Sequence, residues 1–178
     1  MPSARIWKII NMVQSSVLFP NRIRMILLRF FGVNMDRSAR IADNVYLGGS
    51  NFVMEKGTFI NVGSFIDGCA SVILEEYVRV GPYVKILTGT HKLRNSPLRR
   101  WPKDPVVSKS VIIKRGCWLG IGCIILPGVT IAPGCVIGSG AVVTKDTEPH
   151  GFYVGVPAIR LKDLPINEEM LSGFLIDG

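Results

Sequence analysis

The stretch IKRGCW LGIGCI ILPGVT IAPGCV IGSGAV VTKD spans residues 113–146 and repeats one pattern every six residues. Each block opens with an aliphatic residue, at Ile113, Leu119, Ile125, Ile131, Ile137 and Val143. A small or short residue follows four positions later, at Cys117, Cys123, Val129, Cys135 and Ala141. Neither a helical period of 3.6 nor a strand period of 2 produces this pattern. A period of six is typical of a parallel β-helix, in which three short strands make one coil.

The positions of each block have different physical roles in such a coil. We expect the opening aliphatic residue to fill the inside of the coil, and the residue four positions on to point inward where space is tighter. A glycine lies between them in each of the first five blocks, in the turn, where a positive φ costs it little. One coil cannot bury its apolar face alone, so the coils must stack.

The same period begins earlier in the chain. Blocks IADNVY, LGGSNF and VMEKGT start at Ile41, and the pattern resumes at Ile60 after a slip of one residue. A second slip precedes LEEYVR and VGPYVK. We interpret the slips as bulged turns and predict an all-β solenoid over residues 36–161.

The repeat stops between residues 88 and 109, in TGTHKLRNSPLRRWPKDPVVSK. This segment holds one of the two histidines of the chain, His91. Long loops that interrupt a regular fold are commonly functional. Its basic residues either keep a surface loop soluble or meet an anionic substrate; they are Lys92, Arg94, Arg99, Arg100 and Lys103.

Both ends of the chain differ from the repeat. The spacing of apolar residues in residues 1–35 predicts two amphipathic helices, separated by a break at Phe19-Pro20-Asn21. Basic residues lie among the apolar positions of these helices: Arg5, Lys8, Arg22, Arg24 and Arg29. Such helices suit a membrane surface, and they equally suit a cap over the first coil; the two roles are compatible. We expect residues 162–178 to form a short C-terminal cap, since an open sheet edge invites aggregation.

The composition limits the partners. The chain has 178 residues and a net charge of +8, which favours an anionic partner: a phosphate-bearing ligand, an acidic glycan, a membrane surface or nucleic acid. Nucleic acid is disfavoured because aromatic residues that could stack on bases are not interleaved with the charges. Three of the four cysteines occupy the inward small position and predict buried core residues, which suits a reducing, cytoplasmic location. No CxxC pair and no cleavable signal peptide is evident.

The stretch CWLGIGCIILPGVTIAPGCVIGSGAVVTKD, followed by VGVPA, resembles the hexapeptide-repeat acyltransferases. Among them it is similar to the sugar O-acetyltransferases of the galactoside, maltose and exopolysaccharide or colanic-acid type. The resemblance covers about residues 41–161 and implies a left-handed parallel β-helix that assembles as a homotrimer. It further implies that acetyl-CoA binds in a groove between neighbouring coil stacks, and that no metal is needed.

The resemblance implies that His91 is the general base. The chemistry asks for such a group, because a sugar hydroxyl is a poor nucleophile at neutral pH and a base that titrates near pH 7 can remove its proton. Where relatives often carry an aspartate after the histidine, this chain has Lys92. We therefore consider Asp67 and Asp36 as carboxylates that could orient the imidazole.

Further site residues are carried over from the same resemblance. Asn61 and Trp118 occupy positions at which the family contacts the acceptor or the pantetheine arm; alternatively, they are a turn residue and an outward packing residue. The acetyl-CoA site is expected at Gly120, Ser139, Thr144, Lys145 and Arg160. Lys145 and Arg160 would meet the CoA phosphates. Relatives carry a cation where this chain has Ile159, and here either Arg160 or Lys162 would take its place.

We therefore expect an acetyl-CoA-dependent O-acetyltransferase that acts on a sugar hydroxyl in exopolysaccharide, capsule or lipid-linked glycan biosynthesis. The main alternative is N-acetylation of a nucleotide-linked amino sugar. A non-enzymatic scaffold would leave His91 unexplained. A carbonic-anhydrase-like zinc site requires three histidine ligands, whereas the chain has only His91 and His150.

Overall fold

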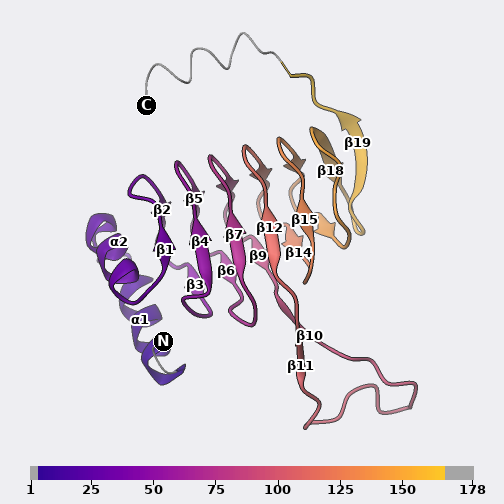
Figure 1. Ribbon diagram of the computed structural model, residues 1–178, viewed down its shortest axis with the longest axis horizontal. Helices are drawn as coiled ribbons and strands as arrows, with labels where there is room; N and C mark the ends of the chain where they lie inside the picture. The colour runs from indigo at the N-terminus through magenta and orange to yellow at the C-terminus, as the bar shows by residue number, and fades with distance from the viewer. Residues whose placement is uncertain (1–3, 167–178) are drawn as a thin grey trace.

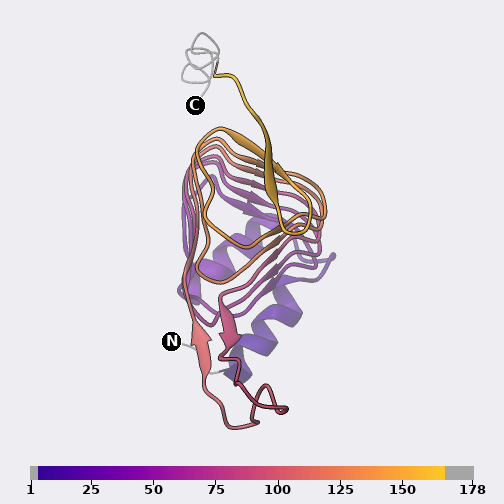
Figure 2. The same cartoon turned by 90° about the vertical axis from the view of Figure 1, so that its right-hand side faces the viewer.

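The computed structural model describes residues 4–166, which form a parallel β-solenoid with two helices at one end (Figure 1). Seen along its axis, the stacked coils superpose as a rounded triangle (Figure 2). The solenoid predicted from the period of six is therefore confirmed. The last residues of the expected C-terminal cap, 167–178, lie outside the described residues.

Three parallel sheets form the sides of the triangle. The first contains β1 (Asn34–Met35), β4 (Phe52–Met54), β7 (Val72–Leu74), β12 (Val111–Ile113) and β15 (Thr130–Ile131). The second contains β2 (Arg40–Ile41), β5 (Phe59–Ile60), β8 (Arg79–Val80), β13 (Trp118–Leu119), β16 (Val136–Ile137), β18 (Gly151–Val154) and, antiparallel at its end, β19 (Ile159–Asp163). The third contains β3 (Tyr46–Leu47), β6 (Phe65–Ile66), β9 (Lys85–Ile86), β14 (Ile124–Ile125) and β17 (Val142–Val143).

The irregularities of the repeat all fall at one corner of the triangle, between the third sheet and the first. In the second half, Ile112 pairs with Thr130, three blocks of six later. In the first half, the two slips lie between β3 and β4 and between β6 and β7. The segment that interrupts the repeat lies between β9 and β12, at the same corner. We call this corner the hairpin corner, because the insertion contains the antiparallel pair β10 (Gly89–His91) and β11 (Val106–Ser108).

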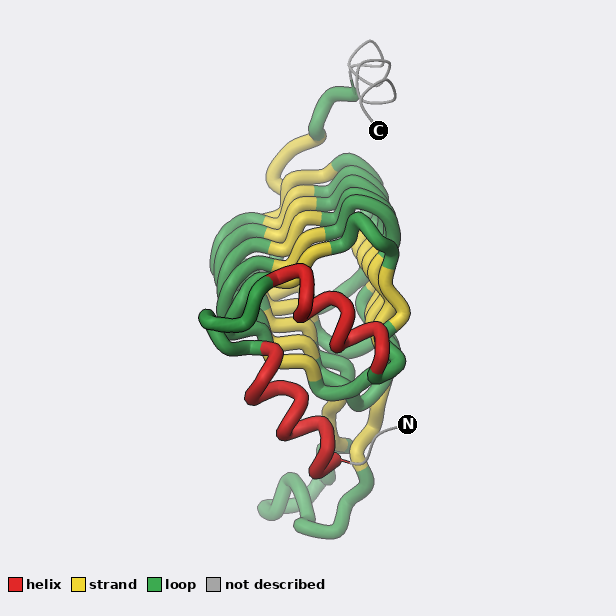
Figure 3. Tube along the Cα trace, turned by 90° about the vertical axis from the view of Figure 1, so that its left-hand side faces the viewer, coloured by secondary structure: helices red, strands yellow, loops and turns green. Residues whose placement is uncertain are grey.

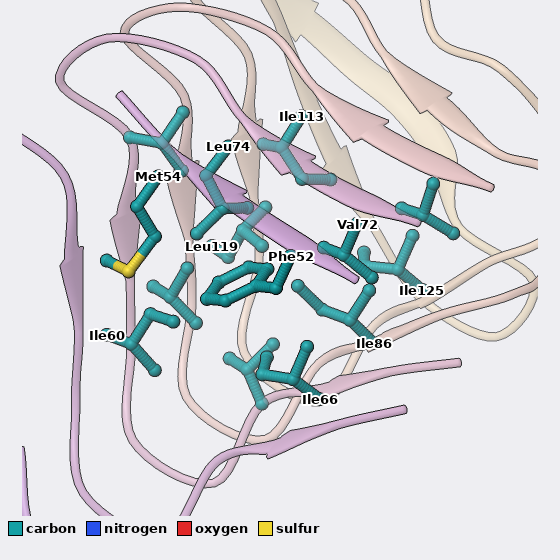
Figure 4. Close-up of a cluster of buried hydrophobic side chains, with 14 of the residues drawn as sticks. Phe52, Met54, Ile60, Ile66, Val72, Leu74, Ile86, Ile113, Leu119 and Ile125 are labelled. Atoms are coloured by element: carbon teal, nitrogen blue, oxygen red, sulfur yellow. The ribbon is translucent and has the colours of Figure 1, made fainter. Parts of the chain in front are cut away.

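Inward side chains fill the solenoid in continuous rows (Figure 4). Leu74, Ile113 and Ile131 stack in the first sheet and are fully buried. Each such side chain stabilises the fold by about 1.5–3 kcal/mol through its burial. The small inward positions are buried as predicted, and Cys117, Cys123 and Cys135 are at most 1% exposed. The three thiols are therefore core residues.

The turn position that favours glycine is occupied four times by a larger residue. Asn44, Tyr77, Tyr83 and His150 have positive φ, between 53° and 59°. A Cβ atom on Gly134 would lie 2.3 Å from Nδ1 of His150, so this imidazole packs against the glycine of the preceding coil. His150 therefore has a structural role in the last turn.

The two N-terminal helices, α1 (Ala4–Gln14) and α2 (Asn21–Phe30), cover the open end of the first coil (Figure 3). Trp7, Ile10, Met25 and Leu28 join the core, each at most 7% exposed. Through these side chains the two helices pack on the first coil. Within residues 4–166, neither helix has the length and apolarity that a membrane crossing requires.

Arg24 differs from the exposed cations Arg5, Lys8 and Arg22 of the same two helices. It is only 3% exposed, and its guanidinium donates hydrogen bonds to backbone carbonyl oxygens of Gln14, Ser16, Phe19 and Ile41. Desolvation lowers the pKa of Arg24 from its ordinary value, against the opposing effect of Asp43. The residue ties the helical cap to the first coil, and helical periodicity alone could not distinguish it from its exposed neighbours.

Candidate active site

His91 ends β10, in the hairpin that projects from the hairpin corner (Figure 1). Gly89 pairs with Ser108, and His91 pairs with Val106 on the returning strand. The segment is thus an ordered two-stranded arm at its base. The insertion lies between β9 and β12 and does not disturb the stack. The coils on either side of it remain in register, with Val72 opposite Val111.

The imidazole of His91 is half-buried. Its Nδ1 atom is buried and has no hydrogen-bond partner within residues 4–166. A buried polar atom without a partner costs about 1–3 kcal/mol, and such exceptions in folded proteins call for an explanation. A partner supplied by a second subunit or by a bound substrate would remove this cost.

Asp67 anchors the base of the hairpin. Its Oδ2 accepts hydrogen bonds from the Thr88 amide at 3.0 Å, the Thr88 hydroxyl at 3.1 Å and the Gly89 amide at 2.7 Å. Its Oδ1 accepts from the Gly68 amide at 2.8 Å. Burial raises the pKa of Asp67, but the hydrogen bonds from Thr88, Cys69 and Gly89 together outweigh it and hold the pKa below its ordinary value.

Neither carboxylate considered for His91 is hydrogen-bonded to it among the described residues. The oxygens of Asp67 accept from the hairpin base instead. Asp36 lies in the first coil, after β1, where its Oδ1 accepts from the amide and hydroxyl of Ser38. Asp67 therefore positions the arm that carries His91, a role that its place in the repeat did not reveal.

The rest of the insertion is folded by a second carboxylate. Asp104 forms an ion pair with Arg94 and accepts a hydrogen bond from the Trp101 amide at 2.9 Å. The hydrogen bond from Arg94 is the main reason that the pKa of Asp104 lies well below its ordinary value. Arg94 is thus paired, whereas Arg100 and Lys103 are exposed and have no ion pair within the described part of the chain.

Asn61 and Gly120 lie together at another corner, between the second sheet and the third. Asn61, Gly81, Gly120 and Gly138 follow strands that stack on one another, and we call this column the glycine corner. A Cβ atom on Gly120 would lie 2.7 Å from the carbonyl oxygen of Ile137, so neighbouring coils approach closely here.

The glycine corner offers few free donors of its own. The Gly120 amide donates to the Ile137 carbonyl at 2.7 Å and is therefore occupied by the stack. Oδ1 of Asn61 accepts from the Val62 amide at 2.8 Å. Ser139, next to Gly138, is exposed at the same corner.

Trp118 points outward from the second sheet, 58% exposed, between Arg79 of the preceding coil and Val136 of the next. It does not contribute to the core of its own chain. The large exposed indole is available to a ligand or to another subunit.

The two cations expected at the CoA phosphates have different surroundings. Lys145 follows β17 at the hairpin corner, exposed beside Thr144, and its side chain makes no ion pair or hydrogen bond with residues 4–166. Arg160 lies on β19 and donates to the carbonyl oxygen of Pro149 at 3.0 Å and to Asp163 at 2.8 Å. Hydrogen bonds to Tyr153 and Asp163 raise the pKa of Arg160. Arg160 is thus occupied within its own chain.

Six of the expected site residues therefore fall into two groups on one chain, whereas Trp118 lies on the second sheet and Arg160 on β19. His91, Thr144 and Lys145 lie at the hairpin corner, and Asn61 with Gly120 and Ser139 lies at the glycine corner. The third sheet separates the two corners. Within residues 4–166, no cluster of three or more His, Cys, Asp or Glu side chains could hold a metal ion.

Comparison with known proteins agrees with this architecture. Residues 110–145 match the family model described as bacterial transferase hexapeptide (six repeats). A search of curated protein sequences finds no match.

Solved structures share the fold over most of the chain. A maltose O-acetyltransferase from Clostridium difficile is 27% identical, with a TM-score of 0.75, over 92% of this chain and 87% of that one. A hexapeptide-repeat acetyltransferase from Vibrio cholerae, complexed with acetyl coenzyme A, is 21% identical over 92% and 87%, with a TM-score of 0.79. A mutant N-acyltransferase from Bacillus cereus, bound to dTDP-4-amino-4,6-dideoxyglucose and coenzyme A, is 17% identical over 86% and 95%, with a TM-score of 0.70. The chain thus carries the bacterial transferase hexapeptide repeat and has the fold of the hexapeptide-repeat acetyltransferases.

Proposed function

We propose that this chain is an acetyl-CoA-dependent O-acetyltransferase that acetylates a sugar hydroxyl, with His91 as the general base. The observation that carries the proposal is the buried, unpartnered Nδ1 of His91 on an ordered arm that interrupts the hexapeptide repeat. The likeness to a maltose O-acetyltransferase supports the reaction class. Among the acceptors, a hydroxyl on an exopolysaccharide, a capsule glycan or a lipid-linked glycan is our first choice.

The reaction needs no covalent enzyme intermediate. His91 takes the proton from the acceptor hydroxyl while its oxygen attacks the thioester carbonyl carbon of acetyl-CoA. The new C–O bond gives a tetrahedral oxyanion, and its collapse breaks the C–S bond. The proton passes from the imidazolium to the departing thiolate, so that the products are the acetyl ester and CoA.

We propose that the enzyme works as a homotrimer. The hairpin corner and the glycine corner lie on opposite edges of the third sheet, so one chain does not bring His91 next to Asn61 or Gly120. Three triangular prisms around a three-fold axis would place the hairpin corner of one chain against another chain. Acetyl-CoA would then lie between subunits, near Trp118 and Lys145.

The exposed cations of the insertion suit an anionic acceptor. Arg100 and Lys103 form no ion pair within the described residues, although Arg100 is attracted to Asp104, and Lys92 directly follows His91. Trp101, which is 47% exposed, offers an apolar ring face beside them. A sugar that carries a carboxylate or phosphate would be attracted to this part of the hairpin.

The decisive experiment measures CoA release from acetyl-CoA against a panel of sugars, nucleotide-linked amino sugars and lipid-linked glycans. Mild base hydrolyses an ester product and leaves an amide intact, which separates the proposal from its main alternative, N-acetylation. The Bacillus cereus N-acyltransferase makes that alternative worth testing. Protein that neither binds CoA nor turns over any acceptor would contradict the proposal.

The role of His91 is tested with the acceptor that this panel identifies. His91→Ala should lower turnover by about 10²- to 10⁴-fold, the usual contribution of a general base, with unchanged CoA affinity. His150→Asn is the matched control, because asparagine tolerates a positive φ and His150 packs against Gly134 on its own chain. An His91→Ala variant with the wild-type rate would show that another group is the base.

A further inference from the structure

The helical cap has a second, outer face that the solenoid does not cover. Its inner residues pack on the first coil, which accounts for the capping role. The outer side leaves large apolar side chains in solvent: Ile9 is 58% exposed, Met12 71%, Leu18 89%, Ile26 64% and Phe30 82%. Figure 3 looks onto this end of the molecule, with both helices in front of the coils.

The outer face is also basic, without compensating acids. No aspartate or glutamate occurs in residues 4–35. Arg5, Lys8 and Arg22 are exposed, and their side chains form no ion pair or hydrogen bond with the described residues. Arg24 and Arg29 differ, because backbone carbonyl oxygens of the cap and first coil occupy their guanidinium groups.

We propose that this outer face docks on the surface of an anionic lipid bilayer. Exposed apolar side chains alternate with free cations, the combination that holds a helix in the plane of a membrane interface. A second copy of the same face would bring cations against cations, whereas anionic headgroups supply the missing charge. Leu18 and Phe30, the most exposed of the apolar side chains, are suited to enter the boundary between headgroups and acyl chains.

Docking in this orientation would bring the catalytic arm close to the membrane. The hairpin leaves the third coil, about 10 Å beyond the first coil, because neighbouring coils are about 4.8 Å apart. The helices between the first coil and the membrane add about 10 Å, so the hairpin base would lie about 20 Å from the bilayer surface. Figures 1 and 3 both show the hairpin extending to the same side of the solenoid as the N-terminal end of α1. A lipid-linked acceptor would therefore be within reach of His91; this last step alone rests on the proposed function.

The test is binding of the full-length protein to vesicles of phosphatidylcholine, with and without phosphatidylglycerol. We expect binding only to the anionic vesicles, and weaker binding as salt is added. Replacing Arg5, Lys8 and Arg22 together by glutamine should weaken binding by on the order of 100-fold. Leu18→Ser with Phe30→Ser should also weaken it, and both sets are exposed, so circular dichroism should report an unchanged fold.

The matched control removes three charges elsewhere. Lys56→Gln, Lys109→Gln and Arg115→Gln make the same change in net charge at exposed positions of the solenoid and should leave vesicle binding nearly unchanged. The proposal is wrong if the two triple variants lose affinity for anionic vesicles equally, or if the wild-type protein does not bind anionic vesicles. It is also overturned if sedimentation shows that the Leu18 and Phe30 substitutions break an oligomer, since the face would then bind a second copy. Acetyl transfer to a soluble acceptor would persist in each case, which separates this test from that of the catalytic function.

Discussion

Asp67 offers the most direct test of how the fold positions His91. In the wild type, Oδ2 of Asp67 accepts three hydrogen bonds, from the amide and hydroxyl of Thr88 and the amide of Gly89. In Asp67→Asn, the carbonyl oxygen of the new side-chain amide can still accept these three bonds. The NH2 group then faces the Gly68 amide, a donor now 2.8 Å from Oδ1. One hydrogen bond is lost, worth about 1 kcal/mol, and the other three lose their charge assistance. Because the site is only half-buried, we take the total as about 2 kcal/mol, a factor of about 30 in the opening equilibrium of the hairpin base.

Amide hydrogen exchange measures this opening directly. Protection of the Thr88 and Gly89 amides should fall about 30-fold in Asp67→Asn. The Leu87 amide, which donates to Ile125 within the coil ladder, should keep its protection. Asp36→Asn is the matched control, since that carboxylate binds Ser38 far from the hairpin. If the Thr88 and Gly89 amides are protected equally in Asp67→Asn and in the wild type, the assignment of Asp67 as the anchor is refuted.

The anchor should also depend on pH. The fold lowers the pKa of Asp67 below its ordinary value of 3.8. Its contribution is therefore fully present above the unfolded pKa and is lost as the pH falls through the folded pKa. Protection of Thr88 and Gly89 should decline only in this acidic range, and Asp67→Asn should abolish that dependence.

Two further predictions concern the last coil and the acetyl-CoA site. Gly134→Ala places a Cβ atom 2.3 Å from Nδ1 of His150, whereas Gly140→Ala meets nothing within 4 Å at a similar φ. We expect Gly140→Ala to cost about 1 kcal/mol from the left-handed backbone and Gly134→Ala about 3 kcal/mol with the added overpacking; equal shifts in Tm would contradict this. Lys145→Gln should weaken CoA binding about tenfold by calorimetry through the loss of a charge-assisted hydrogen bond, with Tm unchanged. Arg160→Gln should mainly lower Tm, because its donors already bind its own chain; unchanged CoA affinity in Lys145→Gln would remove that residue from the site.

The regular half of the solenoid could be predicted closely from the sequence. Every coil repeats the same contacts. A position such as that of Ile125 therefore has the same surroundings as the equivalent positions of the other coils, and the same side-chain size fits all of them. The slips in the first half were also visible, but the sequence could not show that they share a corner with the insertion. That fact depends on which of the three corners each block reaches, and stacking the coils decides it.

The candidate site was predicted only in part. A histidine in an interrupting loop identified His91, and the family resemblance supplied its expected role. The resemblance did not reveal that Asp67 binds the hairpin base, because its partners Thr88 and Gly89 lie more than twenty residues away along the chain. Likewise, the sequence alone suggests that Arg160 is a free cation. In the structure, β19 pairs with β18, and Arg160 donates hydrogen bonds to Tyr153 and Pro149.

The stretch 113–146 by itself determined that the chain is a stack of coils, because a period of six with aliphatic, glycine and small residues fits that geometry and excludes helix and plain strand. It also determined that its three cysteines are core residues. Only the tertiary structure decided which residues meet: it joined the slips and the insertion at the hairpin corner, and placed Asn61 and Gly120 at another. It also turned Arg24 inward while leaving Leu18 and Phe30 in solvent. Such choices depend on contacts between distant segments, and a local pattern does not contain them.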